Sequence, residues 1–160
     1  MNLLSPFLNL HSVRIDLDIA SQKRLFEEAA LAFERTAGIP HDEAFAALSE
    51  RERIGSTALG HGTAVPHGRL ASLEAPEVVF LRTVKPLKVP SPDRSGAQLF
   101  IAILVPESNP EAHLGLLREV AALFSDDAVR AKLLAAKDPV ELCDIIAAWV
   151  PPAGLHPAAD

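Results

Sequence analysis

The chain has 160 residues, of which 49% are hydrophobic, and its formal net charge is −6 at pH 7. This size suits a single domain that buries about 70% of the surface its unfolded chain exposes. The acidic balance argues against a nucleic-acid-binding protein, although a local basic patch could still meet an acidic protein partner.

Cysteine usage and hydropathy narrow the class further. Cys143 is the one cysteine, which excludes an internal disulfide and a cysteine-based zinc cluster and agrees with a reducing compartment. The longest unbroken apolar run, residues 99–105, is far shorter than the ~20 residues of a membrane helix. The N-terminus also lacks the basic start of a secretory signal. We therefore expect a cytoplasmic protein with no membrane insertion.

The first elements are a short strand and a helix. Residues 13–17 alternate apolar and polar side chains, as a half-buried strand does. Asp18 or Ser21 then begins a helical pattern, and Gly38 and Pro40 end it. The apolar positions of this helix are Leu25, Phe26, Ala29, Ala30 and Phe33.

A second helix is expected over about residues 42–53. Its pattern turns Phe45 and Leu48 inward and places Arg51 in the last turn. A cation there suits the negative end of the helix dipole, so Arg51 also has a purely structural explanation.

The next stretch, residues 55–69, holds four of the eight glycines, which are Gly55, Gly60, Gly62 and Gly68. From residue 51 to residue 69 the ionisable side chains are three arginines, two histidines and a single acid, Glu52. Glycine lets backbone N–H groups approach a ligand closely, while Pro66 favours an extended Val65 just ahead of His67. Such a cationic stretch in an acidic chain predicts an anion site, most simply for phosphate.

Two further strands are expected after it. Residues 77–84 are rich in Val, Phe and Leu, and Pro86 is expected to close this strand. Residues 90–96 have the turn chemistry of a surface loop. The unbroken apolar run at 99–105 predicts a central strand covered on both faces.

The last part of the chain predicts three helices. Asn109-Pro-Glu-Ala-His113 resembles a helix start, which puts His113 near a helix N-terminus and just beyond the central strand. Ser125-Asp-Asp is expected to cap a helix carried by Val129, Leu133 and Leu134, and Asp138-Pro139 to start another carried by Leu142, Ile145, Ile146 and Trp149. The ordered core is expected at about residues 3–150, with a flexible tail at 151–160.

The six histidines divide into two groups. His11, His41 and His156 are expected at the surface. The other three, His61, His67 and His113, lie near loops or element ends, and together with water they match the ligand count of catalytic zinc. Zinc explains neither the glycines nor the arginines, whose charge would repel a cation, so neither a metal nor a cofactor is expected.

Other chemistries lack their motifs. The chain has no Gly-x-Ser-x-Gly elbow, no Gly-Lys-[Ser/Thr] phosphate loop and no Gly-x-Gly-x-x-Gly fingerprint. What remains is a histidine that accepts a phosphoryl group, with arginine and a second histidine stabilising the charge.

These residues also resemble a known family. Arg51-Glu-Arg-Ile-Gly-Ser-Thr-Ala-Leu-Gly-His-Gly-Thr-Ala-Val-Pro-His-Gly-Arg69 is similar to the signature of the enzyme IIA components of the bacterial phosphoenolpyruvate phosphotransferase system, fructose/mannitol type. The start, with Asp16-Leu-Asp18 and Ser21-x-Lys-Arg-Leu-Phe-Glu, and the stand-alone length resemble the nitrogen-regulatory branch. The resemblance implies an α/β fold, a mixed β-sheet with helices on both faces, in a single domain spanning 1–160.

The resemblance also implies roles for individual residues. His67 matches the phosphorylated histidine, Arg51 the arginine before the glycine run, and His113 the second active-site histidine. Phosphate-supporting roles are expected for His61, Gly62, Gly68 and Arg69. His61 departs from the family pattern, which has Glu or Asn there, and imidazole differs from both because it can become charged near neutral pH.

The implied function is a phosphoryl carrier that receives phosphate from an HPr-like phosphocarrier of the nitrogen branch. Its phosphorylation state would then signal to regulatory targets such as potassium-transport or sensor proteins. Two alternatives stay open: a sugar-transport IIA that passes phosphate to a IIB component, and a binding regulator that does not need phosphate.

Overall fold

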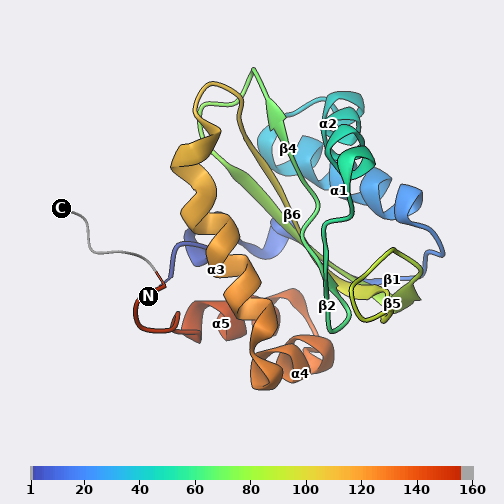
Figure 1. The fold of residues 1–160 in the computed structure, drawn as a ribbon, viewed down its shortest axis with the longest axis vertical. Coiled ribbons are helices and arrows are strands. Elements are labelled where there is room, and N and C mark those ends of the chain that lie inside the picture. The colour runs from blue at the N-terminus through green and yellow to red at the C-terminus, as the bar shows by residue number, and fades with distance from the viewer. Residues whose placement is uncertain (1, 156–160) are drawn as a thin grey trace.

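Within residues 2–155, which the computed structural model describes, six strands form one mixed sheet (Figure 1). The strands are β1 (Val13–Leu17), β2 (Ala58–Gly60), β3 (Thr63–Ala64), β4 (His67–Leu70), β5 (Glu77–Leu87) and β6 (Ala97–Pro106). The helices are α1 (Gln22–Ala37), α2 (His41–Ile54), α3 (Leu114–Ser125), α4 (Asp127–Ala135) and α5 (Pro139–Ala148), with 3-10 turns η1 (Ser5–Phe7), η2 (Leu10–Ser12) and η3 (Pro110–His113). None of these helices is long and apolar enough to cross a membrane.

Strand β6 is the centre of the sheet. The strand order is β1-β5-β6-β3-β2. Strand β4 lies along the same edge of β6 as β3, but it pairs with the later part of β6, residues 103–106. Strand β5 is antiparallel to β6, whereas β3 and β4 are parallel to it. The predicted central strand is therefore confirmed, with buried side chains along nearly its whole length.

Helices cover both faces of the sheet, as the family resemblance implies (Figure 1). Alternate residues of β6 point to opposite sides, since successive side chains of a strand do so. Leu99, Ile101, Ile103 and Val105 pack with α3, α4 and α5, while Phe100, Ala102 and Leu104 pack with α1 and α2. This double burial explains why the segment reads as one apolar run rather than as an alternating pattern.

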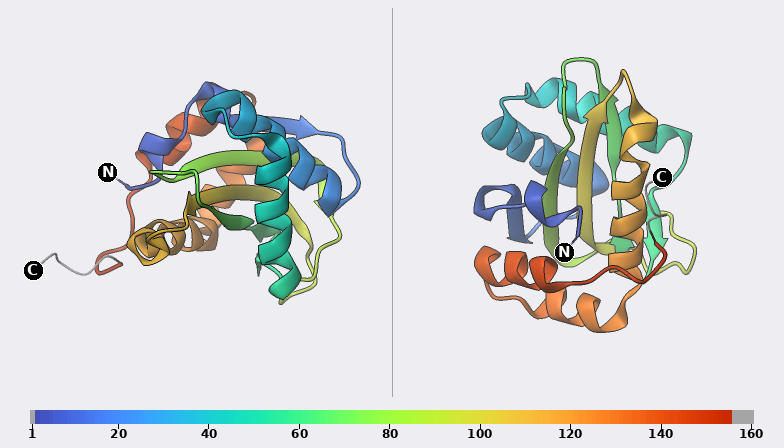
Figure 2. Two further views of the ribbon diagram at one scale, coloured as in Figure 1. Left: turned by 90° about the horizontal axis from the view of Figure 1, so that it is seen from above. Right: turned by 90° about the vertical axis from the view of Figure 1, so that its left-hand side faces the viewer.

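The N-terminal segment is fastened to the other end of the chain (Figure 2). The Asn2 side-chain amide donates to the carbonyls of Ile146 at 2.8 Å and Trp149 at 2.9 Å. The backbone N–H of Leu4 donates to Glu119 Oε2 at 2.8 Å, and the Leu4 side chain is fully buried. These contacts attach the segment to α3 and α5.

Several sequence predictions are confirmed at residue level. Strand β1 covers the expected residues, and Ser21 rather than Asp18 caps α1, accepting from the Arg24 N–H at 3.2 Å. Gly38 ends α1 in the left-handed conformation, with φ of 70°. His11 and His41 are exposed, as expected.

Other predictions need correction. Pro86 does not close β5, which continues to Leu87. The pairing of β5 with β6 shifts register between Arg82 and Leu87, so the missing N–H of this exposed proline falls where no regular ladder bond is required. The Gln98 side chain fills part of the gap by donating to the carbonyls of Thr83 and Val84.

The helix ends also differ from the sequence pattern. Residues 110–113 form the 3-10 turn η3, so α3 begins four residues later than Pro110, at Leu114, and the Asn109 side chain makes no capping bond. Leu134 is 45% exposed and does not belong to the core. Of the predicted tail, residues 151–155 include a turn from Pro152 to Leu155, while 156–160, with His156, lie outside the described residues.

Candidate active site

Strand β4 brings the expected nucleophile to the edge of the sheet, between the end of α2 and the start of α3 (Figure 1). A depression of about 760 Å³ lies there. It gathers five of the residues singled out from the sequence, which are Arg51, His67, Gly68, Arg69 and His113. The chain thus brings together residues from α2, β4 and the η3–α3 junction.

The ring of His67 has a defined orientation. Its Nδ1 lies 2.8 Å from the carbonyl oxygen of Val65, which can only accept a hydrogen bond. Nδ1 must therefore carry the proton, and the lone pair of the neutral ring is on Nε2. Pro66, directly before His67, favours an extended conformation of Val65.

The surroundings also favour the neutral ring. Burial lowers the pKa of His67, and the charges of Arg51 and Arg69 lower it further, while the Val65 carbonyl and the Glu52 carboxylate oppose the shift. A neutral imidazole is the form that can attack phosphorus. His67 therefore keeps its nucleophilic form to lower pH than a free histidine side chain.

A pH titration tests this environment. We expect the NMR titration midpoint of His67 to lie below the ordinary pKa of 6.5, and the Arg69→Gln variant to raise it, because one repelling charge is lost. The folded pKa lies below the unfolded one, so the unfolded chain binds this proton more readily. The contribution of His67 to stability is thus present above about pH 6.5 and is lost as the pH falls through the folded pKa. A titration midpoint of His67 at or above 6.5 would contradict the expected lowering of its pKa.

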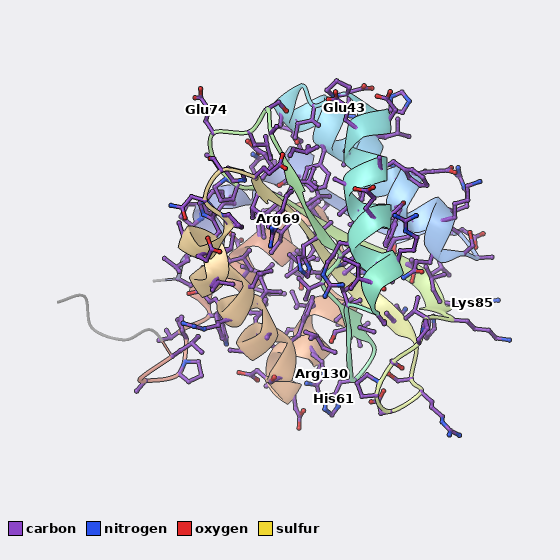
Figure 3. The ribbon with its side chains drawn as sticks, turned by 45° about the horizontal axis from the view of Figure 1, so that its top comes forward. Glu43, His61, Arg69, Glu74, Lys85 and Arg130 are labelled. Atoms are coloured by element: carbon purple, nitrogen blue, oxygen red, sulfur yellow. The ribbon has the colours of Figure 1, made fainter. Side chains whose placement is uncertain are left out.

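Two arginines supply positive charge to the depression. Arg51 extends from the last turn of α2, where its Nη1 donates to the Gly55 carbonyl at 2.8 Å. Arg51 therefore both caps the end of α2, as expected, and lines the depression. Arg69 alternates with Gly68 on β4 and is exposed, and Figure 3 shows it between α2 and α3. Guanidinium groups bind phosphoryl oxygens through paired hydrogen bonds.

His113 occupies the cap position of α3, with φ of −109° and ψ of 9°. It and Leu114 both line the depression, so the N-terminus of α3 borders it. The positive end of the α3 dipole favours an anion at this place, while the Leu114 N–H already donates to the Glu111 carbonyl of the preceding 3-10 turn.

Gly68 serves close packing. A Cβ at this position would lie 2.7 Å from the carbonyl oxygen of Ala47 and 2.8 Å from its carbon. Only glycine lets β4 approach the backbone of α2 so closely, and this approach brings Arg51 and His67 into one depression.

We expect Gly68→Ala to destabilise the protein by about 1–3 kcal/mol, the usual range for an overpacked site. Urea unfolding would measure the loss. Gly55→Ala is the matched control, since an added Cβ there meets nothing within 4 Å and the backbone is extended, with φ of 172°. Equal stability of the two variants would refute the packing explanation.

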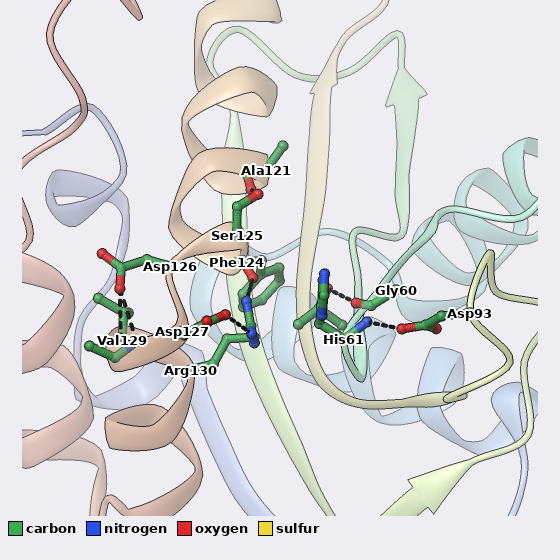
Figure 4. Close-up of polar contacts among 12 residues, drawn as sticks. Gly60, His61, Asp93, Ala121, Phe124, Ser125, Asp126, Asp127, Val129 and Arg130 are labelled. Atoms are coloured by element: carbon green, nitrogen blue, oxygen red, sulfur yellow. Dashed lines mark hydrogen bonds and ion pairs between the residues drawn. The ribbon is translucent and has the colours of Figure 1, made fainter.

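His61 and Gly62 lie elsewhere. They form the β2–β3 turn, where the His61 N–H donates to Asp93 Oδ2 at 2.8 Å (Figure 4). The Gly62 N–H donates to Ser95 Oγ at 2.9 Å. The segment then runs along β6, with Thr63 opposite Leu99 and His67 opposite Ile103. Four residues of strand span ~13 Å, and Figure 3 shows His61 well apart from Arg69.

The supporting role expected of His61 and Gly62 is therefore not favoured by their positions, because neither lines the depression. Their amides are already paired with the 91–96 loop. The three histidines considered as zinc ligands are also separated, because His61 does not line the depression that holds His67 and His113.

Sequence reasoning missed the rim of the depression. Its apolar members include Ile54, which is 83% exposed, and Leu114, which is 45% exposed. Its acids are Glu50, Glu107 and Glu111. In the sequence, only Ile54, an apolar residue directly after the charged end of a helix, could have indicated an exposed apolar rim. Nothing in the sequence pointed to Glu107 or Glu111.

Comparisons with known proteins bear on the family of the chain. Residues 6–149 match the family described as phosphoenolpyruvate-dependent sugar phosphotransferase system, EIIA 2. A nitrogen regulatory protein of Bradyrhizobium diazoefficiens is 33% identical over 137 residues, which cover 86% of this chain and 88% of the relative.

Solved structures show the same fold. The nitrogen regulatory protein IIA-Ntr from Neisseria meningitidis superposes with a TM-score of 0.85 at 36% identity, covering 91% of this chain and 99% of that one. Enzyme IIAMtl from Escherichia coli, solved in complex with phosphorylated enzyme IIBMtl, has a TM-score of 0.70 at 18% identity and covers 89% and 98%. The resemblance seen in the glycine-rich stretch is confirmed, and this chain belongs to the EIIA 2 family of the phosphoenolpyruvate-dependent sugar phosphotransferase system.

Proposed function

We propose that the chain is a cytoplasmic phosphoryl carrier whose acceptor atom is Nε2 of His67. The observation that carries this proposal is the bond from Nδ1 to the Val65 carbonyl, which leaves the Nε2 lone pair free in a depression that also holds Arg51 and His113. Phosphoryl transfer depends mostly on positioning and charge stabilisation, and these groups can provide both.

The transfer exchanges one P–N bond for another. The Nε2 lone pair attacks the phosphorus of a donor phosphohistidine, and the bond from phosphorus to the donor ring breaks, returning its electron pair to that ring. The His67 ring keeps its Nδ1 proton and becomes positively charged, which strengthens its bond to the Val65 carbonyl. Arg51, Arg69 and His113, which line the same depression, then stabilise the charge on the phosphoryl oxygens.

The rim supports a protein as donor. Exposed apolar side chains beside a nucleophile, here Ile54 and Leu114, are typical of a protein contact surface. The carboxylates of Glu50, Glu107 and Glu111 around them favour a donor with basic residues next to its phosphohistidine. We propose an HPr-like phosphocarrier of the nitrogen branch as this donor, as the resemblance described above implies.

Phosphate on His67 would act as a signal through charge. It adds about −1.5 to −2 charges to a surface whose inner part is cationic. A partner with acidic residues facing Arg51 and Arg69 binds the unphosphorylated form better, because the negative phosphate on His67 repels those acidic residues. We propose regulatory targets such as potassium-transport or sensor proteins as partners of this kind.

Reconstitution tests the acceptor role. The protein is incubated with phosphoenolpyruvate, enzyme I and an HPr-like carrier, and intact mass is measured before and after acid treatment. We expect the mass of one phosphoryl group, lost in acid and stable in base, as for phosphohistidine. No gain in mass under conditions that phosphorylate the carrier would reject the proposal and leave a phosphate-independent binding regulator.

Adding a IIB component tests the remaining alternative. The IIAMtl structure noted above contains phosphorylated enzyme IIBMtl, so a chain of this fold can meet a IIB partner. Rapid loss of phosphate from this protein to IIB would favour a role in sugar transport. Retention of phosphate, with partners that differ between the two forms, would favour the regulatory role.

A further inference from the structure

A chain of hydrogen bonds leads from Glu52 to the ring of His67. Glu52 Oε2 accepts from the Thr57 backbone N–H at 3.0 Å, and Oε1 accepts from the Thr57 hydroxyl at 2.6 Å. The Thr57 carbonyl in turn accepts from the Val65 N–H at 3.0 Å. The Val65 carbonyl is the acceptor for His67 Nδ1. The last turn of α2 is thereby connected to the acceptor ring.

These hydrogen bonds hold residues 65 and 66, a segment with few other contacts that fix it. Residues 65 and 66 lie between β3 and β4, and Pro66 has no N–H to donate. Its carbonyl accepts from Ile103 at 2.9 Å, which fixes the segment from the β6 side. Thr57, which is 7% exposed, fixes it from the opposite side, and Glu52 uses both carboxylate oxygens to hold Thr57.

The charge of Glu52 has a second effect. Phosphorylation at Nε2 makes the ring cationic beside Arg51 and Arg69, which disfavour a further positive charge. Glu52 acts in the opposite direction, since its carboxylate raises the pKa of His67. The same carboxylate can therefore offset part of the repulsion in the transition state.

We propose that Glu52 is a positioning residue for phosphoryl transfer, which holds the Nδ1–H tautomer of His67 through Thr57 and Val65 and stabilises the positive charge that the ring gains. The inference rests on the proposed role of His67 and adds a residue outside the depression. Glu52, the one acid in the cationic stretch, then acts on His67 through Thr57 and Val65.

Three variants separate geometry from charge. Glu52→Gln can keep both contacts, with its oxygen accepting from the Thr57 N–H and its amide donating to the hydroxyl, but it removes the charge. Glu52→Ala removes both, and Thr57→Val removes the hydroxyl contact alone. The Nδ1 and Nε2 chemical shifts of ¹⁵N-labelled His67 report the tautomer and the pKa, and single-turnover transfer from the phosphorylated carrier reports the rate.

We expect Glu52→Ala to mix the two tautomers and slow transfer about 10²-fold, as a small misplacement of a reacting group does. Glu52→Gln should keep the Nδ1–H tautomer, lower the pKa of His67 and slow transfer roughly tenfold, about 1.4 kcal/mol in the barrier. Thr57→Val should mix the tautomers at unchanged charge. Glu43→Gln, which removes an exposed carboxylate from the first turn of α2, should match the wild type.

The readouts distinguish this inference from the proposed function. Unchanged tautomer and pKa in Glu52→Ala would overturn it, as would changed spectra with a wild-type transfer rate. If the wild type itself accepts no phosphate, the acceptor role fails, while the spectra still decide whether Glu52 orients the ring. A poorly folded Glu52→Ala variant leaves the decision to Glu52→Gln and Thr57→Val.

Discussion

His67→Ala is expected to abolish acid-labile phosphorylation completely. His67 is the one residue of the glycine-rich stretch whose side chain lies in the depression with a nucleophilic nitrogen and a backbone contact that fixes the ring. Alanine removes the bond-forming atom, so no remaining group can take over the transfer. Intact mass after reconstitution would show an unmodified protein.

His11→Ala is the matched control, because His11 is exposed and its backbone rather than its ring makes the contacts of η2. This control should gain phosphate at the wild-type rate. Circular dichroism should show both variants folded, since the partly exposed ring of His67 contributes little to the core. An acid-labile phosphate on the His67→Ala protein at the normal rate would end the assignment.

His113→Ala is expected to leave the acceptor in place and to slow its transfer by roughly 10²- to 10³-fold. Loss of one charge-assisted donor costs ~2–4 kcal/mol in the transition state, which corresponds to that change in rate. Stopped reactions analysed by intact mass would give the rate. Arg51→Ala should behave similarly, and Arg51→Lys should recover only part of the rate because an ammonium lacks the paired donors of a guanidinium.

The two substitutions differ in a way that can be checked. Arg51 lowers the pKa of His67, so Arg51→Ala should raise the titration midpoint of the ring as well as slow transfer. Wild-type kinetics in His113→Ala would remove His113 from the transfer step, although it lines the depression.

Much of the fold was predictable because its signals are local. The apolar run at 99–105 identified the central strand, and the caps at Ser21 and Asp138 identified helix starts that the structure confirms. The strands between residues 58 and 70 were missed, since none has more than four residues and glycines interrupt them. Too few side chains remain there to show a period of two.

The site was predictable to the extent that its residues come from motifs. Arg51, His67 and His113 share the depression, as the family resemblance implied. His61 and Gly62 were expected to support the phosphate from their places in the motif, but the chain runs along β6 between them and His67, and neither lines the depression. The acids Glu107 and Glu111 come from beyond β6, and only the parallel pairing of β4 with β6 brings that end of the chain next to His67.

The bond from Asn2 to Ile146 joins residues 144 positions apart, and this separation matters while the protein is being made. At about 5–20 residues per second, translation takes roughly 7–30 s to reach the partner of the second residue. During that time Leu4, which ends fully buried among α3 and α5, has no finished surface to pack against. Helices α1 and α2 are synthesised much earlier, but they pack on Phe100, Ala102 and Leu104, so the half of the molecule that carries Arg51 is complete only after β6. The half that carries His113 needs α5 as well, so the two sides of the phosphate site are completed one after the other during synthesis.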